Sequence, residues 1–319
     1  MRLVLRKLLY IGGMLLLISL ISFVAIHAAP NSFFAAGQLN PNITKESIEH
    51  LKAVYGLDKP LWEQYLRWVW AMLHLDFGLS FSSGKSVAGE IASRIPITLT
   101  MNVISMILVF AVSLRLGITA ALRQRSAGDR AIKQLALVSF AMPSFYLALI
   151  LILILGLHLG WFPISGLQSI DPKTGLMKWA DYAWHLAIPI FVMVFGGIGG
   201  LTMYVRSLTL EILKSDYIFF AKARGIGEAT IRKRFILPNL MPSIVTILGL
   251  SLPGLIGGSV IIESIFSING MGLLFYQSAL SRDYPVIMGI LIITAFLTLL
   301  GNVLADLALW KLNPYAKRN

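Results

Sequence analysis

The sequence has no cysteine among its 319 residues. Such a chain forms no disulfide and has no thiolate metal site or cysteine nucleophile. Its five histidines lack the paired spacing of a metal site, and neither an HExxH nor a GxSxG motif occurs. We therefore expect no catalytic residues, no bound metal and no other cofactor in this chain.

Charged residues are also scarce, at 13% against roughly 25% in soluble domains, whereas 57% of the chain is hydrophobic. The hydrophobic residues gather in runs of about 20, the length that crosses a hydrocarbon core of roughly 30 Å. The sequence therefore predicts an all-α polytopic membrane protein. We expect six transmembrane helices, near residues 8–28, 97–121, 135–158, 184–205, 240–266 and 285–310.

The net charge of +12 is distributed unevenly about these spans. Of the 27 lysines and arginines, 18 fall on one side of the membrane, and six of the others lie in the long segment before Pro96. Long segments translocate largely regardless of charge, so the positive-inside rule predicts that both termini and residues 206–238 are cytoplasmic. Topology explains the basicity, which argues against a nucleic-acid partner.

The chain is expected to divide into four parts. The first apolar run, Leu8 to Ile26, is longer than the roughly 7–15 residues of a signal-peptide core, which predicts an uncleaved first transmembrane helix. The expected parts are the first helix (1–29), an extracytoplasmic segment (30–96), a five-helix core (97–310) that contains the cytoplasmic loop 206–238, and a cytoplasmic tail (311–319).

An amphipathic stretch from Trp62 to Leu73 lies in the extracytoplasmic segment. Its tryptophans suit a membrane surface, as in an aromatic belt. Packing against the outer ends of the spans is the alternative, at least as well supported as contact with a partner.

The loop between the fourth and fifth spans carries local helix signals. Ser215 or Asp216 can cap a short helix. Gly225 can end it, because glycine adopts the left-handed conformation without a Cβ clash. A second short helix follows, Pro238 blocks its continuation, and Asn239 can cap the next helix.

Ala221, Gly225, Leu237 and Pro238 fall on the spacing of the EAA loop of bacterial ABC importer permeases, in which a glycine is followed after nine residues by Ile-x-Leu-Pro. Phe235 replaces the isoleucine here. The sequence thus resembles that family, and in particular its dipeptide, oligopeptide and nickel branch. Further stretches with this resemblance lie along nearly the whole chain, at 56–60, 64–65, 76–80, 143–145, 160–163, 263–266, 270–272, 283–285 and 313–314.

The chain departs from the loop's pattern at Phe219 and Phe220, which stand where the motif has glutamate and its first alanine. The peptide and nickel branch tends to share this departure. The residues that the resemblance assigns to coupling with an ATPase are Phe219, Phe220, Ala221, Lys222, Ala223, Arg224, Gly225, Leu237 and Pro238.

The resemblance implies a type I ABC importer permease in the bacterial inner membrane, surrounded by membrane lipid. Its implied partners are a second homologous permease subunit, two ATPase subunits and an extracytoplasmic substrate-binding protein. The implied cargo is a di- or oligopeptide, with nickel or a nickel chelate as the alternative. The chain has no P-loop, because Leu79 stands where the first glycine of a motif ending in Gly84-Lys85-Ser86 would be. ATP hydrolysis is therefore expected on separate subunits.

Two functions of other classes stay open. A secondary transporter would need coupling-ion sites and usually inverted repeats, and we find no internal repeat. A membrane-embedded enzyme would need a cluster of catalytic residues, and none is visible in the sequence.

A few polar and small residues interrupt the apolar spans, and each is expected to have a structural or functional role. An acid at mid-bilayer costs roughly 2.5–3.5 kcal/mol, so Glu263, near the outer end of the fifth span, is predicted to face the translocation path or brace an outer gate. A capping or interfacial role is the alternative. Asp306 is expected to pair with a nearby lysine or arginine. Gly196 and Gly200 form a small-xxx-small pattern that predicts helix packing.

Overall fold

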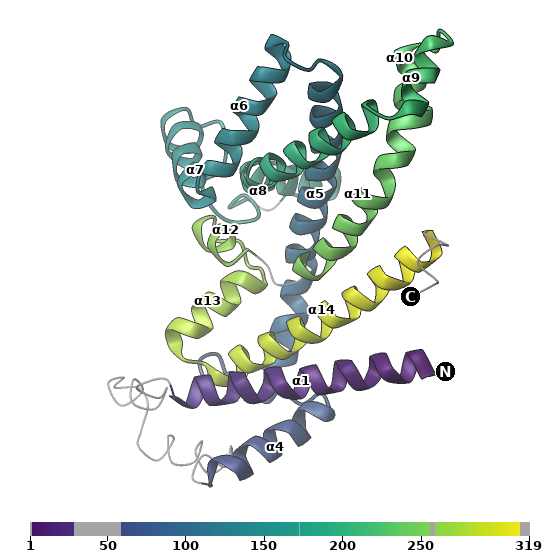
Figure 1. The fold of residues 1–319 in the computed structure, drawn as a ribbon. Helices are drawn as coiled ribbons and strands as arrows, with labels where there is room; N and C mark the ends of the chain where they lie inside the picture. Colours follow the sequence, from purple (N-terminus) through teal and green to yellow (C-terminus); the bar gives the residue numbers. More distant parts are fainter. Residues whose placement is uncertain (1, 29–58, 172, 256–258, 313–319) are drawn as a thin grey trace.

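The computed structural model describes residues 2–28, 59–171, 173–255 and 259–312 (Figure 1). Within these residues the chain is helical throughout, apart from turns and one isolated bridge between Leu79 and Ser86. In chain order the elements are α1 (Arg2–Ala28), α4 (Leu61–Leu73), α5 (Val87–Leu122), α6 (Ala127–Ala141), α7 (Ser144–Leu151), the π-helix η1 (Ile152–His158), α8 (Gly175–Leu213), α9 (Asp216–Ala223), α10 (Glu228–Ile231), the π-helix η2 (Arg232–Ile236), α11 (Leu237–Ser251), the 3-10 helix η3 (Leu252–Leu255), α12 (Val260–Ile265), α13 (Met271–Ser281) and α14 (Tyr284–Leu312).

The long helix α5 forms the centre of the fold, and three clusters of buried hydrophobic side chains lie along it. The cluster at its start also includes α13 and α14. The middle cluster includes α7, α8 and α12. The cluster toward its end includes α8, α9, α10, η2 and α11. The helices α1 and α14 pack against each other, and α4 lies beside α1 (Figure 1).

Glycines allow α8 to approach its neighbours closely. A Cβ added at Gly197 would lie 2.7 Å from a Val109 methyl group on α5, and one at Gly199 would lie 2.6 Å from the Ala136 carbonyl oxygen on α6. Gly196 and Gly200, in contrast, have no such neighbour within 4 Å. The prediction that Gly196 and Gly200 serve helix packing is therefore wrong within this chain, because these two glycines lie on the strip of α8 between its contacts with α5 and α6.

The helix that contains the second predicted span starts before the span itself. α5 begins at Val87 rather than near residue 97, and Pro96 lies inside the helix. The outer part of α5 packs through Val87 and Ile91 against α13 and α14. This burial provides a reason for the helix to extend beyond the apolar run that marked the span.

The third predicted span, 135–158, is not one straight helix. α6 ends at Ala141, and the helix that starts at Ser144 is bent from it by 99°. Pro143 has no N–H and disfavours the helical conformation of the residue before it. Met142 is accordingly extended, with φ −81° and ψ 120°.

The fifth predicted span, 240–266, is also interrupted. α11 ends at Ser251, a 3-10 turn follows, and α12 covers only Val260–Ile265. Pro253 in the 3-10 turn lacks the N–H that would continue the α-helix.

Among the described residues, four helical stretches are long and apolar enough to cross a membrane, or five if the bent pair of α6 with α7 and η1 counts as one span. The apolar stretch described within α1, Leu9–Ala25, is shorter. Six spans therefore stay a prediction. The Asp306 side chain and the motif residues 56–58 and 313–314 lie outside the described residues.

Candidate functional site

The predicted stop at Gly225 is confirmed by the backbone. Gly225 has a φ of 75° and follows α9 in the left-handed conformation. Its N–H donates to the Lys222 carbonyl at 2.9 Å, and the Ile226 N–H donates to the Ala221 carbonyl at 3.1 Å. These are the two bonds of a Schellman motif. A Cβ at Gly225 would meet no atom within 4 Å, so the backbone angle is what requires glycine here.

α9 has a buried face and an exposed face. Ile218 and Ala221 are buried, and Ile218 belongs to the cluster at the cytoplasmic end predicted for α5. Phe219 and Phe220 are 68% and 60% exposed. The other exposed residues assigned to coupling from the sequence are Lys222, Ala223, Arg224 and Gly225. Exposed aromatic side chains in such a group are typical of a protein contact surface.

Leu237 and Pro238 lie apart from that exposed group, at the start of α11. The prediction that Pro238 ends the preceding helix is wrong, because α10, η2 and α11 run on as one helical stretch, Glu228–Ser251. The π-turn of η2 immediately precedes the proline, and such wider turns absorb an interruption of the hydrogen-bond ladder.

The predicted caps in this loop also differ from the structure. The Ser215 hydroxyl donates back to the Ile212 carbonyl at 2.5 Å and does not cap α9. Asn239 lies inside α11, where its amide donates to the Phe235 carbonyl at 2.6 Å. Both side chains therefore bond to the preceding turn, an alternative open to short polar residues.

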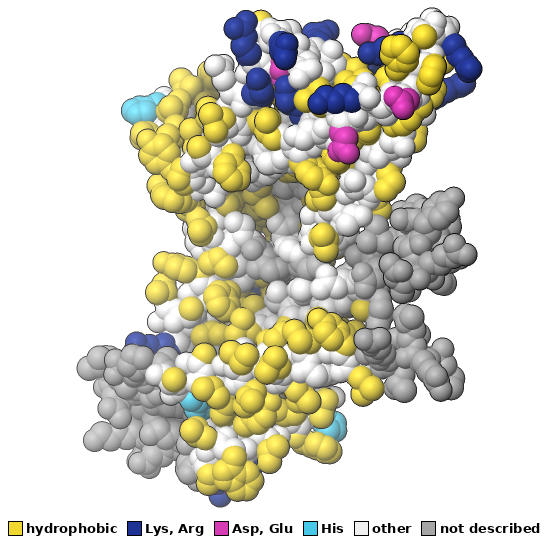
Figure 2. Space-filling model, in the orientation of Figure 1, with side chains coloured by type: hydrophobic (Ala, Val, Ile, Leu, Met, Phe, Trp, Pro, Cys, Tyr) yellow, Lys and Arg dark blue, Asp and Glu magenta, His cyan; other side chains and the backbone are white. Residues whose placement is uncertain are grey.

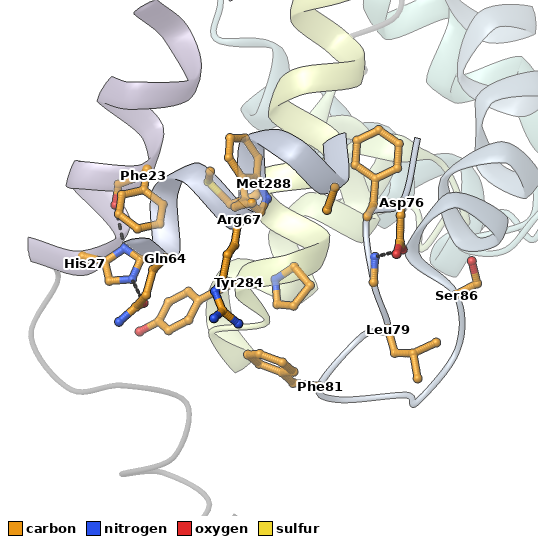
Figure 3. Close-up of a pocket in the computed structure, with 15 residues that line it drawn as sticks. Phe23, His27, Gln64, Arg67, Asp76, Leu79, Phe81, Ser86, Tyr284 and Met288 are labelled. Atoms are coloured by element: carbon orange, nitrogen blue, oxygen red, sulfur yellow. Dashed lines mark hydrogen bonds between the residues drawn. The ribbon is translucent and has the colours of Figure 1, made fainter. Parts of the chain in front are cut away.

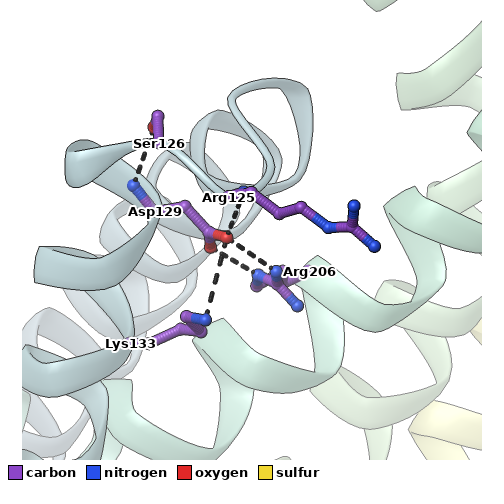
Figure 4. Close-up of polar contacts among 5 residues, drawn as sticks. All are labelled: Arg125, Ser126, Asp129, Lys133 and Arg206. Carbon is purple, nitrogen blue, oxygen red and sulfur yellow. Dashed lines mark hydrogen bonds and ion pairs between the residues drawn. The ribbon is translucent and has the colours of Figure 1, made fainter.

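A buried carboxylate fixes the base of the loop (Figure 4). Asp129 is 1% exposed, and its two oxygens accept from Arg206 Nε at 2.8 Å and from the second guanidinium nitrogen at 2.9 Å. It also accepts from the Arg125 backbone N–H at 2.9 Å, and Lys133 Nζ lies 3.9 Å away. The paired fork of an arginine and a carboxylate fixes geometry as well as charge. The turn between α5 and α6 is thus attached to α8 where loop 206–238 begins.

The sequence alone does not indicate this pairing. Its one local signal is Ser126, three residues before Asp129, because a serine followed by an acid at that spacing marks a helix start. The Ser126 hydroxyl indeed accepts from the Asp129 N–H at 3.2 Å. Arg206, 77 residues later, could not be assigned from sequence.

Basic side chains gather at the end of the molecule that carries α9, α10 and the turn between α5 and α6 (Figure 2). This is the end that the positive-inside rule assigns to the cytoplasm. α9 and the turn between α5 and α6, next to which Asp129 lies, are both at this end (Figure 1).

Glu263 is 1% exposed and caps another helix. Its carboxylate accepts from the Gly272 N–H at 2.7 Å, the Leu273 N–H at 3.1 Å and the Thr98 hydroxyl at 3.0 Å. Thr98 in turn accepts from the Met271 N–H at 2.8 Å. The first free N–H groups of α13 are satisfied in this way. Glu263 and Thr98 therefore join α12, α13 and α5.

A third buried carboxylate, Asp283, joins two of the motif stretches. Asp283 is 1% exposed and accepts from the Ser80 hydroxyl at 2.5 Å and from the N–H groups of Phe81 and Ser82 at 3.1 and 3.0 Å. The loop before α5 is thereby fixed to the start of α14. Both stretches belong to the family resemblance in the sequence, but the sequence does not indicate that they meet.

Two hollows lie near these elements. One, of about 660 Å³, lies between α1, α4, the loop before α5 and the start of α14, and aromatic side chains and Arg67 line it (Figure 3). The other, of about 390 Å³, lies at the bend between α6 and α7, where Ser139, Ser144, Gly196 and Ser259 are among its lining residues. Within the described part of the chain, no group of three or more histidines or acids could hold a metal ion.

Comparison with known proteins assigns the chain to a family. The sequence model of the family described as "Binding-protein-dependent transport system inner membrane component" matches residues 113–317, and the model of its N-terminal region matches residues 1–102. The chain belongs to this family. It is a multi-pass permease of the inner membrane, as the sequence resemblance predicted.

Two relatives of this permease match over nearly its whole length. The oligopeptide transport system permease protein AppB of Bacillus subtilis (strain 168) is 37% identical over 305 residues, which cover 95% of each chain. The dipeptide transport system permease protein DppB of Escherichia coli (strain K12) is 32% identical over 317 residues, which cover 93% of each.

A solved structure supports the predicted fold. The permease matches a chain of the MetNI methionine ABC transporter in an inward facing conformation with a TM-score of 0.56 and 18% identity. The match covers 70% of this chain and 96% of that one. The permease therefore has the helical fold of an ABC importer permease.

Proposed function

We propose that this permease forms the transmembrane path of an ATP-driven importer of di- or oligopeptides. The family gives the ABC importer class, and relatives that match almost end to end are named for peptide transport. Those names favour peptides over nickel, the alternative cargo that sequence resemblance left open. The exposed surface of α9 carries the proposal, because it provides a place where an ATPase can act on the membrane helices.

The proposed assembly has two ATPase subunits, a second related permease and an extracytoplasmic substrate-binding protein. α9 would dock in a groove of one ATPase through Phe219 and Phe220, with Lys222 and Arg224 beside them. Their exposure supports this role, because large apolar side chains that remain exposed in one chain favour burial against another.

Movement of the docked α9 would reach the membrane helices through two contacts. Ile218 packs in the core cluster that includes α5, α8 and α11, and Ala221 is buried on the same helix. The Asp129–Arg206 pair holds the start of the loop to the turn between α5 and α6. A loop with both attachments would move with these helices rather than bend alone.

The proposed topology keeps six spans with both termini in the cytoplasm. α1 would be the first span, the bent pair of α6 with α7 and η1 the third, and α11 together with α12 the fifth. Non-helical backbone at membrane depth is tolerated where it is buried in protein or lines a cavity. The polar hollow at the bend between α6 and α7 is therefore the proposed position of the substrate path.

Glu263 would act on this path indirectly. Its oxygens already accept bonds from α5 and α13, which suits a residue that holds an outer gate rather than one that binds cargo. Glu263→Gln is accordingly expected to leave the preference among peptides unchanged.

Uptake of a labelled dipeptide and of labelled nickel, measured side by side in cells with and without this gene, tests the proposed cargo. We expect deletion to abolish peptide uptake alone. Loss of nickel uptake alone would overturn the cargo and leave the importer class standing. Peptide uptake that persists after ATP depletion, while the proton gradient is held, would instead favour a secondary transporter.

A further inference from the structure

We propose that α4 is an interfacial helix whose outward face lies among the lipids of the outer leaflet. The inference rests on the proposed topology, in which α1 crosses the membrane. Four large apolar side chains of α4 are exposed, namely Trp62 at 66%, Leu66 at 56%, Trp70 at 67% and Leu73 at 69%. At 100° per residue they lie within about 80° of the helix surface. Figure 2 shows the hydrophobic surface in this part of the molecule.

A polar face borders this apolar face. Glu63, Arg67 and His74 lie beside it on the helix, and Glu63 accepts from two guanidinium nitrogens of Arg67 at 3.1 and 2.8 Å. An apolar face with tryptophans next to a charged face is the pattern of a helix that lies in the plane of a membrane surface.

The third face fixes the depth of α4 against α1 (Figure 1). The Tyr65 hydroxyl lies 2.8 Å from the Ser19 hydroxyl and donates to the Leu16 carbonyl at 3.3 Å. Ser19 is seven residues before Ile26, where the apolar run of the sequence ends, or about 10 Å at 1.5 Å per residue. Interfacial helices bury their apolar face roughly 5–10 Å into the boundary between headgroups and acyl chains.

This depth selects lipid as the occupant of the outward face. A soluble binding protein would contact residues above the headgroups, whereas the Tyr65 contact holds α4 beside the apolar part of a span. The apolar face also has no charged side chain that could match a charged partner, because Glu63 and Arg67 pair with each other on the adjoining face.

The absence of cysteine from this chain makes a direct test available, since a single introduced cysteine can be labelled at one position before the chain is assembled with its partners. Trp62→Cys, Leu66→Cys and Trp70→Cys would each carry a nitroxide in the full assembly, reconstituted in phospholipid nanodiscs. Power saturation compares collisions with oxygen, which concentrates in lipid, and with a water-soluble nickel chelate. We expect more frequent collisions with oxygen at these three positions, and with the chelate at the matched controls Glu63→Cys and His74→Cys.

Two results would overturn the inference. Chelate access at Leu66 equal to that at the controls would place the face in water. Protection of the nitroxides from both reagents would place the face against protein. If the collision rates changed on adding the binding protein, that protein would be the occupant. Leu66→Cys gives a second reading if a tryptophan variant fails to assemble. Peptide uptake is measured in the same labelled assemblies. Uptake without lipid exposure of α4 would contradict this inference alone, whereas a loss of uptake in every assembly would contradict the proposed function.

Discussion

At the scale of single residues, three buried or strained positions determine how the permease is held together. Gly225 has a backbone angle that disfavours other residues, Asp129 pairs with Arg206, and Asp283 accepts three hydrogen bonds from the loop before α5. Each fixes the position of a segment that has few other attachments. Substitution at these positions is therefore expected to change the movement of the attached segment or the stability of the permease.

Gly225→Val is expected to uncouple ATP hydrolysis from transport. The left-handed conformation costs a residue with a Cβ about 1–2 kcal/mol, so α9 and α10 would relax to another angle and α9 would lie differently on the ATPase. Uptake per ATP hydrolysed should fall about tenfold, since 1.4 kcal/mol corresponds to tenfold in an equilibrium constant. Hydrolysis and uptake are measured in the same membrane vesicles.

Gly227→Val is the matched control for this change. Gly227 has a φ of −66° and, like Gly225, no neighbour within 4 Å of an added Cβ. Valine adopts that angle without strain, so coupling should stay near normal. Normal coupling in Gly225→Val as well would contradict a role for the angle at Gly225.

Asp129→Asn is expected to loosen the base of the coupling loop. The amide keeps the shape but leaves the Arg206 guanidinium, 12% exposed, without its charged partner. We expect a loss of about 2 kcal/mol in stability, the usual cost of leaving a buried polar group unpaired. Thermal unfolding of the purified assembly in detergent measures this loss.

Glu63→Gln serves as the comparison, since it removes an ion pair whose arginine is 59% exposed. An exposed pair contributes at most about 1 kcal/mol, and the melting temperature should barely change. Equal shifts in the two variants would show that the Asp129 pair has no special part in stability.

At the scale of elements, the contacts of α8 explain how a long helix packs on two sides and leaves a third open. Gly197 meets α5 and Gly199 meets α6, whereas Gly196 and Gly200, which lie between them on the helix surface, have no neighbour within 4 Å of an added Cβ. Gly196 also lines the hollow at the bend between α6 and α7. One helix therefore combines close packing with a surface available to cargo or to a second permease.

Gly199→Ala should destabilise the permease and Gly200→Ala should not. The methyl group at residue 199 would meet backbone atoms of α6, at 2.6 Å from the Ala136 oxygen and 2.9 Å from the Phe140 nitrogen. Overpacking of this kind costs about 1–3 kcal/mol. The amount of folded protein in membranes and its melting temperature measure the effect, and equal behaviour of the two variants would show that α6 moves aside at little cost.

At the scale of the whole molecule, the sequence predicted what depends on local signals. Long apolar runs marked most of the membrane helices, and Gly225 marked a helix end through its conformational freedom. The sequence could not predict pairings across long separations, such as Arg206 with Asp129 or Ser80 with Asp283, 203 residues apart. Hydropathy gave no sign of the bend at Pro143, because both arms of the bend are apolar, but the proline itself predicts a kink or a helix start there.

The reconstituted assembly gives the most direct test of the central claim, that this chain carries peptides when separate ATPase subunits act on it. Proteoliposomes would contain the permease, its partner permease and the ATPases, with the binding protein and a labelled dipeptide on the outside. We expect uptake that requires internal ATP and stops when this chain is omitted. Uptake that continues without ATP, or without this chain, would contradict it.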